Sequence, residues 1–525
     1  MKMKPLVLGN SAISLEEVEQ VAVHGRKVRL ATSTRTRIAT AHRYLLGKAR
    51  SGGTFYGINT GFGLLSNVRI DDGDIEQLQV NLIRSHAVGV GACLADEQVR
   101  AMLLLRAWNL CQGHSGVAVA TVQRLLDFLN HGIHPLIPEQ GSVGASGDLA
   151  PLSHLALPLI GEGRVRFGGK VMDGARALAR ARLKPLRLGP KEGLALINGT
   201  QFMTAIGTLA LLKAEHLCDT ADVIGAMSVE AMRGTDAAFE PEIQAVRPHP
   251  GQIRTAANLR AVLSTGGRSE ISKSHEGCGK VQDPYSLRCM PQVHGASRDL
   301  LGFVRGVLER EVNAVTDNPL LFPASDKILS GGNFHGQIVA MAMDMLAIAM
   351  AEIGSISEQR LEKLINPALS DLPAFLIEKG GLNSGFMIIQ VAAASIVSEN
   401  KTLCHPASVD SIPTSADKED HVSMGAWAAR KALRVTENVR KVLSMELLGA
   451  AQGIDLLRPL RSTAAIERIH GLVRRHAAYA DADRSYHEDL GRLECFLESP
   501  ELRAAVGAAL AGAPTKSGRK KRSRR

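Results

Sequence analysis

Apolar residues recur along most of this chain with the spacing of helices. Beyond residue 200 the runs lengthen, become rich in alanine and leucine, and are often apolar on every side. Helices of that kind are typical of the inside of a bundle. The pattern predicts helices at residues 33–46, 74–86, 96–111, 117–130 and 149–157, and longer ones at 202–233, 292–314, 334–365, 380–401 and 423–449.

One short segment has the alternation of strands instead. Residues 164–167 and 170–172 flank Gly168-Gly169, a pair that favours a tight hairpin turn. We therefore expect a mainly α fold with a long central bundle and a short β-hairpin. Its predicted parts are a smaller loop-rich N-terminal region (1–200), a central helical bundle (201–480), C-terminal helices (481–512) and a disordered basic tail (513–525).

The charge changes this picture only at the C-terminus. The 525 residues carry a net charge of +10, but seven Lys and Arg residues between Lys516 and Arg525 supply seven of those charges and leave +3 elsewhere. A basic tail can contact nucleic acid or remain solvated without a partner. The rest of the chain has no nucleic-acid-binding motif.

The cysteines and the apolar stretches indicate the cellular compartment. Seven cysteines are scattered without a CxxC pair, which indicates free thiols in a reducing cytoplasm and no disulfide or zinc framework. No apolar segment follows the basic N-terminus, so we expect no secretory signal. The uncharged stretches 193–212 and 380–398 contain polar and glycine residues, which suits buried helices better than a membrane span.

The tripeptide Ala145-Ser146-Gly147 carries the most distinctive chemistry. Because Gly147 has no side chain, its nitrogen can approach the carbonyl of Ala145 and close a five-membered ring through Ser146. Loss of water would then convert the Ser146 side chain into a methylidene electrophile. A simpler interpretation makes Ser146 and Asp148 the capping and first-turn residues of the helix that follows.

Further polar residues stand in unusual places, and each is ambiguous alone. Tyr56, in a glycine-rich loop, could transfer a proton or pack its ring. His86 ends a predicted helix, Asn198 interrupts an apolar run, and Glu419 lies among acids before another helix. Residues 282–288 combine Gln282, Tyr285 and Arg288; the arginine could bind a carboxylate or form a surface salt bridge.

Together these motifs resemble the aromatic amino acid ammonia-lyases. The matching segments, which span about residues 56–424, are 145–152, 56–63, 198–201, 282–288 and Thr316-Asp317-Asn318-Pro319. The resemblance implies a mainly helical homotetramer whose active sites are shared between subunits. It also implies a 4-methylidene-imidazol-5-one (MIO) group formed from Ala145, Ser146 and Gly147, without an external cofactor or metal.

The resemblance assigns roles to the remaining residues. Asp148 and its helix would assist ring formation, and Asn198 and Phe334 would lie beside the group. Arg288 would hold the substrate carboxylate, and Gln282 would complete the polar lining. Tyr56 or Tyr285 would remove the β-proton, with Tyr56 favoured.

Two residues bear on the substrate. His86 follows Ser85 as in the pattern for histidine, although enzymes acting on tyrosine also have a histidine there. Glu419 favours histidine because a carboxylate pairs well with an imidazole N–H. Departures at Met290, His294 and Lys418 leave a tyrosine lyase or aminomutase as the alternative. A non-catalytic helical scaffold is a more remote one.

Overall fold

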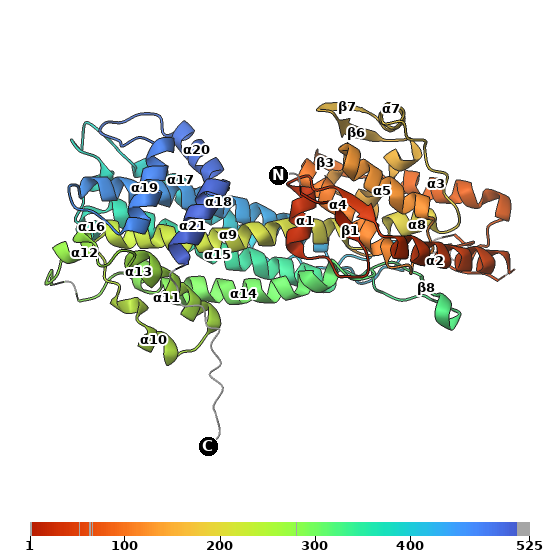
Figure 1. Ribbon diagram of the computed structural model, residues 1–525, viewed down its shortest axis with the longest axis horizontal. Coiled ribbons are helices and arrows are strands. Elements are labelled where there is room, and N and C mark those ends of the chain that lie inside the picture. The colour runs from red at the N-terminus through yellow and green to blue at the C-terminus, as the bar shows by residue number, and fades with distance from the viewer. Residues whose placement is uncertain (1–2, 52, 62–64, 66, 280, 512–525) are drawn as a thin grey trace, which may run out of the picture. The chain divides into compact units, whose positions relative to one another are not determined.

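A computed structural model describes residues 3–51, 53–61, 65, 67–279 and 281–511. Phe62 and Gly63 of the tyrosine loop and the predicted tail (513–525) lie outside these residues. The chain forms two compact units, drawn in Figure 1. The first comprises residues 1–212, 304–344 and 405–433, and the second comprises 213–303, 345–404 and 434–525. The predicted boundaries at 200, 480 and 512 remain predictions.

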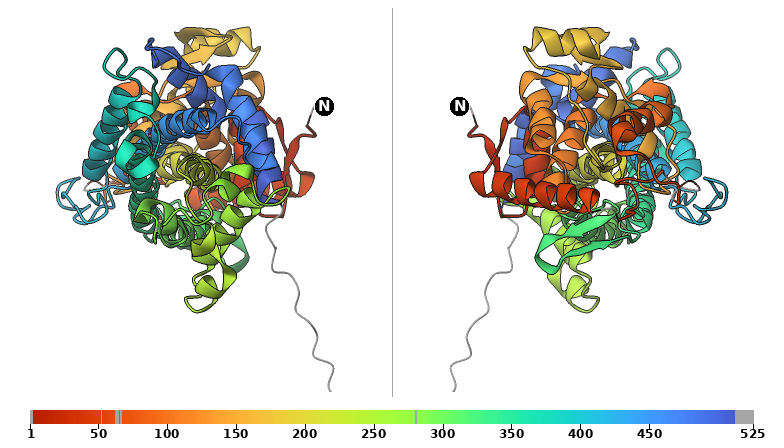
Figure 2. Two further views of the ribbon diagram at one scale, coloured as in Figure 1. Left: turned by 90° about the vertical axis from the view of Figure 1, so that its left-hand side faces the viewer. Right: turned by 90° about the vertical axis from the view of Figure 1, so that its right-hand side faces the viewer.

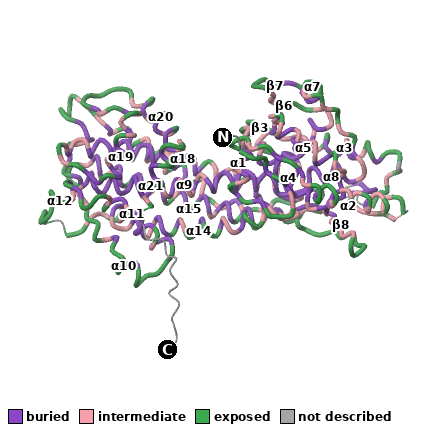
Figure 3. The backbone as a smooth tube through the Cα atoms, in the orientation of Figure 1, coloured by how far each residue is buried: buried purple, intermediate pink, exposed green. Residues whose placement is uncertain are grey.

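The first unit combines helices with small sheets. Its helices are α1 (Leu15–Ala22), α2 (Thr32–Arg50), η2 (Asp72–Asp74), α3 (Ile75–His86), α4 (Asp96–Cys111), α5 (Val119–His131), α6 (Leu149–Ala156), η3 (Leu157–Ile160), α7 (Gly174–Arg180), α8 (Glu192–Ile197) and η5 (Pro323–Ser325). The helix α4 is buried along most of its length, from Val99 to Cys111, as Figure 3 shows. It therefore forms part of this unit's core.

The strands of the first unit are short. They are β1 (Leu6–Leu8), β2 (Val28–Leu30), β3 (Val90–Cys93), β4 (Ile133–Pro135), β5 (Pro138–Gln140), β6 (Arg164–Phe167), β7 (Lys170–Asp173), β8 (Leu320–Phe322) and β9 (Lys327–Leu329). β1 and β2 pair in parallel, and β3–β5, β4–β6–β7 and β8–β9 pair antiparallel. The β6–β7 pair confirms the predicted hairpin, with Phe167 opposite Lys170. It lies beside α7 at one edge of the unit, golden in Figure 2.

The named elements of the second unit are all helices in its described residues. Its own elements are η4 (Ala237–Phe239), α10 (Pro241–Ala245), α11 (Pro250–Leu263), α12 (Glu270–Ser274), α13 (Tyr285–Arg288), α16 (Pro367–Ser370), η6 (Ala374–Leu376), α17 (Met387–Leu403), α19 (Ala464–His476), α20 (His487–Leu497) and α21 (Pro500–Leu510). Four longer helices contribute residues to both units: α9 (Gln201–Ala231), α14 (Met290–Glu311), α15 (Gln337–Ile365) and α18 (Gly425–Leu456).

The mainly helical prediction is confirmed, but two predicted helix bounds are wrong. The helix predicted to end at residue 449 continues as α18 to Leu456. The sequence predicts a helix from residue 380, but α17 begins at Met387. Gly381 and Gly385 have φ values of +95° and +55°, which are incompatible with a right-handed helix. The glycines therefore form a turn ahead of the helix, whereas α4 begins and ends where the pattern predicts.

In the part of the chain that the structure describes, α15 is the one helix with the length and composition to cross a membrane. Within the protein, 61% of its most apolar window is buried. In the first unit its Asp344 forms an ion pair with Lys431 at 2.9 Å, and in the second unit its Arg360 pairs with Glu446 at 2.5 Å. Such pairs are typical of a helix buried among other helices.

Candidate active site

The ring-forming tripeptide occupies a turn that is packed against another turn. Gly147 has a φ of +72°, and a Cβ atom there would overlap the carbonyl group of Gly199. The two glycines form a parallel bridge, and the Asp148 N–H donates to the Gly199 carbonyl at 2.7 Å. Only glycine fits at position 147, because any side chain would separate these segments.

Asn198 connects the same two turns through its side chain. It lies between α8 and α9, and its Nδ2 donates to the Ser146 carbonyl oxygen at 2.9 Å. Its Oδ1 is buried and makes no hydrogen bond among the described residues. An amide oxygen without a partner is costly in a protein interior, so this atom is a candidate for binding a ligand.

Asp148 is completely buried, and its side chain caps a different helix from the predicted one. It stands at the N-terminus of α6 but makes no capping hydrogen bond there. Instead its Oδ2 accepts from the backbone N–H groups of Phe202 and Met203 at 3.0 and 3.1 Å, and Oδ1 accepts from the Ser142 hydroxyl at 3.1 Å. Burial raises the Asp148 pKa to about 7 despite these three donors. The carboxyl group thus joins the tripeptide to the start of α9.

Glu419 directly contacts the reactive serine. The Ser146 hydroxyl donates to its Oε1 at 2.7 Å, and the hydroxyls of Thr414 and Ser415 donate to its Oε2, also at 2.7 Å. Partial burial opposes ionisation, but these hydrogen bonds hold the Glu419 pKa below its ordinary value. The group therefore faces the site as a carboxylate.

His86, at the end of α3, presents a neutral ring. Its Nδ1 lies 2.8 Å from the Leu82 carbonyl oxygen, which can only accept, so Nδ1 carries a proton. Burial lowers the His86 pKa, although the Leu82 carbonyl and the charge of Glu419 oppose this shift. In the neutral ring Nε2 is then a hydrogen-bond acceptor.

A cavity of about 630 Å³ collects these groups within the first unit. Six predicted residues line it: Tyr56, His86, Ser146, Asn198, Phe334 and Glu419. Sequence reasoning did not assign Leu65, Leu82, Leu149, Leu194, Ile197, Asn318, Ser415 or Ala416 to the site. Of these, Asn318 was visible in the Thr316–Pro319 motif, and Leu82 precedes His86 by one helical turn.

Six predicted residues are not in this lining: Ala145, Gly147 and Asp148, which adjoin Ser146 in the turn, and three residues of another part of the chain. Gln282, Tyr285 and Arg288 belong to the second unit, where α13 carries the last two. Tyr285 is 71% exposed, and the Arg288 guanidinium lies 4.6 Å from the centre of its ring. The Arg288 Nε donates to the Asp283 carbonyl at 3.0 Å. The lining of the first unit's cavity contains no residue of α13.

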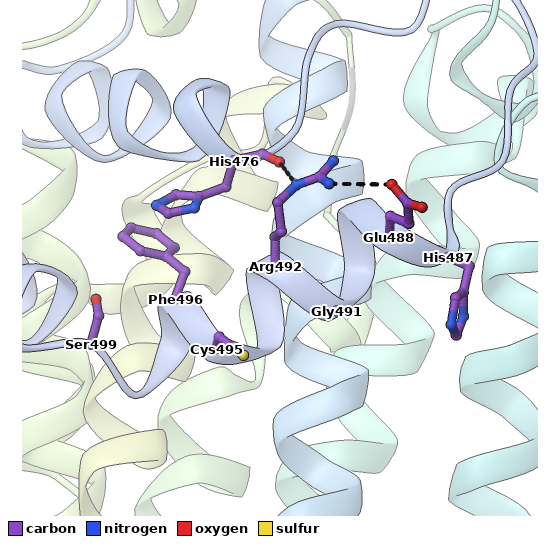
Figure 4. A pocket seen from close by; sticks show the side chains of 8 residues that line it. All are labelled: His476, His487, Glu488, Gly491, Arg492, Cys495, Phe496 and Ser499. Carbon is purple, nitrogen blue, oxygen red and sulfur yellow. Dashed lines mark hydrogen bonds and ion pairs between the residues drawn. The ribbon is translucent and has the colours of Figure 1, made fainter.

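The second unit has a separate surface pocket of about 700 Å³ around α20 (Figure 4). Its side chains include His476, Cys495 and Phe496, with the His476 and Phe496 rings stacked at 4.5 Å. Arg492 donates to the His476 carbonyl at 2.7 Å and pairs with acidic residues of its own helix. Because its charge is already compensated, this pocket presents no free cation to an anionic ligand. No group of three metal-ligating side chains occurs among the described residues.

Comparison with known proteins places this chain in a family. The family model of the aromatic amino acid lyases matches residues 13–475. A histidine ammonia-lyase from Anaeromyxobacter sp. (strain K) is 54% identical over 509 residues, covering 95% of this chain and 100% of the relative. The crystal structure of histidine ammonia-lyase from Trypanosoma cruzi has a TM-score of 0.89 and 44% identity, covering 99% of this chain and 100% of that one.

A tyrosine aminomutase from Streptomyces globisporus also has this fold, with a TM-score of 0.90 at 37% identity; the match covers 97% of this chain and 99% of that one. The chain therefore belongs to the aromatic amino acid lyase family. This confirms the resemblance that the motifs indicated and makes the chain a lyase, not a non-catalytic scaffold.

Proposed function

We propose that this chain is a histidine ammonia-lyase, which eliminates ammonia from L-histidine to give trans-urocanate, the first step of histidine degradation. The observation that carries the proposal is the shared cavity of Ser146, His86 and Glu419. A neutral imidazole acceptor and a carboxylate suit the ring of histidine better than a phenyl ring. The 54% identity to a histidine ammonia-lyase supports the same substrate.

The residues around the tripeptide fit an MIO group. Gly147 lies in a cradle without room for a Cβ, and the buried Asn198 Oδ1 needs a partner. In ring formation, the Gly147 nitrogen would bond to the Ala145 carbonyl carbon, and that oxygen would leave as water with two amide protons. The Ser146 Cα proton and hydroxyl would leave as a second water. The group supplies an electrophile that makes ammonia easier to eliminate.

The surrounding residues would bind the substrate and move its proton. Asn198 would hold the Ser146 carbonyl, as it does through the 2.9 Å hydrogen bond, while Phe334 covers the cavity. Tyr56 lines the cavity and is our preferred base for the β-proton, with Tyr285 as the alternative. Asp148 would assist ring formation through the turn that it anchors.

We further propose that the active protein is a homotetramer whose neighbouring subunits supply Gln282, Tyr285 and Arg288. An exposed apolar stripe supports association: Ile338, Met341 and Ile348 share one face of α15 and are 41–48% exposed. In the second unit, α17 adds Ile388 and Val391. Exposed apolar rows of this kind mark protein interfaces. In the assembled tetramer, Arg288 would hold the substrate carboxylate.

The compartment is also a proposal. The seven cysteines all lie in the described part of the chain, and none of them is joined in a disulfide there. Free thiols support a reducing compartment, for which we propose the cytoplasm. The idea that the basic tail contacts nucleic acid remains a prediction from its charge.

A substrate panel tests the activity. Purified protein is mixed with L-histidine, L-tyrosine or L-phenylalanine, and the absorbance of the corresponding unsaturated acid is followed. We expect kcat/KM to be highest for L-histidine. A faster reaction of L-tyrosine would favour a tyrosine lyase or aminomutase, an alternative supported by the similar fold of the aminomutase. Absence of turnover with all three amino acids would overturn both assignments.

A further inference from the structure

Arg106 is, with Arg360, one of the two largest fully buried side chains among the described residues, and it lies directly behind the active site. It is carried by α4 and is 0% exposed. Its Nη1 donates to the Asn198 carbonyl oxygen at 2.7 Å and to Gln201 Oε1 at 2.6 Å, and its Nη2 donates to Asn109 Oδ1 at 3.0 Å. Asn198 lies in the segment that joins α8 to α9, and Gln201 is the first residue of α9.

The charge of Arg106 is held by neutral groups alone. Among the described residues it forms no ion pair; the nearby carboxylate of Asp317 instead pairs with Lys191 at 2.5 Å. Burial lowers the Arg106 pKa to about 10, although Asp317 opposes the shift, so the guanidinium is protonated at neutral pH. Burying a cation without a counter-ion is costly, and stability alone gives little reason for such an arrangement.

The segment that Arg106 holds has no freedom on either side. A Cβ on Gly199 would lie 2.5 Å from Gln201 Oε1, 2.6 Å from Arg106 Nη1 and 2.8 Å from Thr316 Oγ1. On its other side, the Gly199 carbonyl accepts from the Asp148 N–H at 2.7 Å. The guanidinium thus fixes the position of this turn from behind while the tripeptide contacts its front.

We propose that Arg106 is a positioning residue for the ring-forming tripeptide and that it acts through Asn198. Its bond to the Asn198 backbone orients the side chain whose Nδ2 holds the Ser146 carbonyl at 2.9 Å. This restraint keeps the Gly147 nitrogen and the Ala145 carbonyl in the geometry for ring closure. Arg106 does not line the cavity, so it has no direct contact with a substrate there. The inference rests on the proposed MIO chemistry.

The test measures ring formation separately from turnover. Arg106→Met and Arg106→Lys are purified, and intact mass gives the fraction of chains that have lost two waters, with Ser146→Ala as the ring-free reference. We expect Arg106→Met to lower that fraction by about half or more and kcat by about 10- to 100-fold, with KM changed less than about threefold. Arg106→Lys keeps the charge but not the forked pair of guanidinium N–H donors. We expect its ring fraction and kcat to lie between those of the native protein and Arg106→Met.

Arg100 offers a matched control on the same helix. Its guanidinium binds the carbonyls of Val21, Ala22 and Leu129, away from the tripeptide. Arg100→Met is expected to keep the mass deficit and kcat, even where it lowers the thermal midpoint. If Arg100→Met reproduced the loss of ring, or if Arg106→Met kept both the deficit and kcat, the positioning role would be wrong.

A double-mutant cycle tests the route through Asn198. If Arg106 acts through that residue, Arg106→Met lowers kcat in the native background but by less than about threefold when Asn198→Ala is already present. Fully additive losses would contradict the proposal. Should Arg106→Met fail to fold, Arg106→Lys carries both measurements. Native protein that shows the mass deficit but no lyase activity would overturn the proposed function and leave this inference standing.

Discussion

At the scale of single residues, Glu419 is the carboxylate that contacts both the reactive serine and the neighbouring loop. Glu419 accepts hydrogen bonds from Ser146, Thr414 and Ser415, all at 2.7 Å. Ring formation would remove the Ser146 hydroxyl, but the Thr414 and Ser415 hydroxyls would still hold the carboxylate before substrate arrives and favour its charged form. A fixed, charged acceptor distinguishes an imidazole N–H from an apolar ring edge, so we propose that this residue determines substrate choice.

Glu419→Gln tests that role with little change of shape. The amide keeps one oxygen for the neighbouring hydroxyls but loses the charge, and charge-assisted hydrogen bonds are about twice as strong as neutral ones. We expect KM for L-histidine to rise about tenfold, which corresponds to about 1.4 kcal/mol. Any activity toward L-tyrosine should change less and serves as the internal control. Equal changes of kcat/KM for both amino acids would assign Glu419 to the chemistry common to both.

At the scale of helices, a buried polar cluster joins the elements of the second unit. His294 on α14 is 0% exposed; its Nδ1 lies 2.7 Å from Asp222 Oδ1 on α9, and its Nε2 lies 3.3 Å from Arg360 Nη1 on α15. Arg298 and Asn258 also bind Asp222, and Glu446 pairs with Arg360. A neutral His294 satisfies both neighbours, since it donates at Nδ1 and accepts at Nε2.

This arrangement predicts a specific pH dependence. Burial lowers the His294 pKa, and the charges of Arg360 and Arg298 lower it further while Asp222 opposes them. Unfolded histidine has a pKa of about 6.5, so below that pH the unfolded chain binds the proton more readily and the folded state loses stability. Above about pH 6.5 the stabilisation by neutral His294 is complete.

His294→Leu isolates the effect. At pH 7.5 we expect a loss of about 1–3 kcal/mol, because two buried hydrogen bonds disappear. The difference between the native protein and the variant should shrink as the pH falls below about 6.5, since only the native protein loses the contribution of this histidine. Thermal midpoints at fixed protein concentration measure this difference in stability. His487→Leu, at an exposed histidine, is the control. Parallel pH profiles for native protein and His294→Leu would refute the prediction.

At the scale of the whole molecule, local sequence patterns predicted the bounds of several helices and strands. They did not predict which distant residues contact one another. The range of α4 followed from its cap and apolar spacing, and Gly168-Gly169 was enough to place the hairpin. The Ser146–Glu419 contact joins residues 273 positions apart, and only the family resemblance suggested that they meet. Arg106 gave no signal, because an arginine in a helix is ordinarily solvated and its acceptors lie 92 and 95 residues away.

The proposed sharing of each active site between subunits leads to a prediction about the assembly. Ser146→Ala is expected to fold and lack the ring, and Arg288→Met is expected to fold and bind substrate poorly; each should be nearly inactive alone. If every site takes Ser146 from one subunit and Arg288 from another, random mixing of the two variants gives about a quarter of the sites both native residues.

Co-expression with two different tags allows the mixed assembly to be isolated and its composition checked by native mass spectrometry. We expect it to recover about a quarter of the native kcat, while each variant co-expressed with itself stays inactive. Recovery is possible only if the two residues reach one site from different chains, because no single chain in the mixture has both. A mixed assembly without recovered activity would mean that each site is completed within one chain, and the proposed sharing would then be wrong.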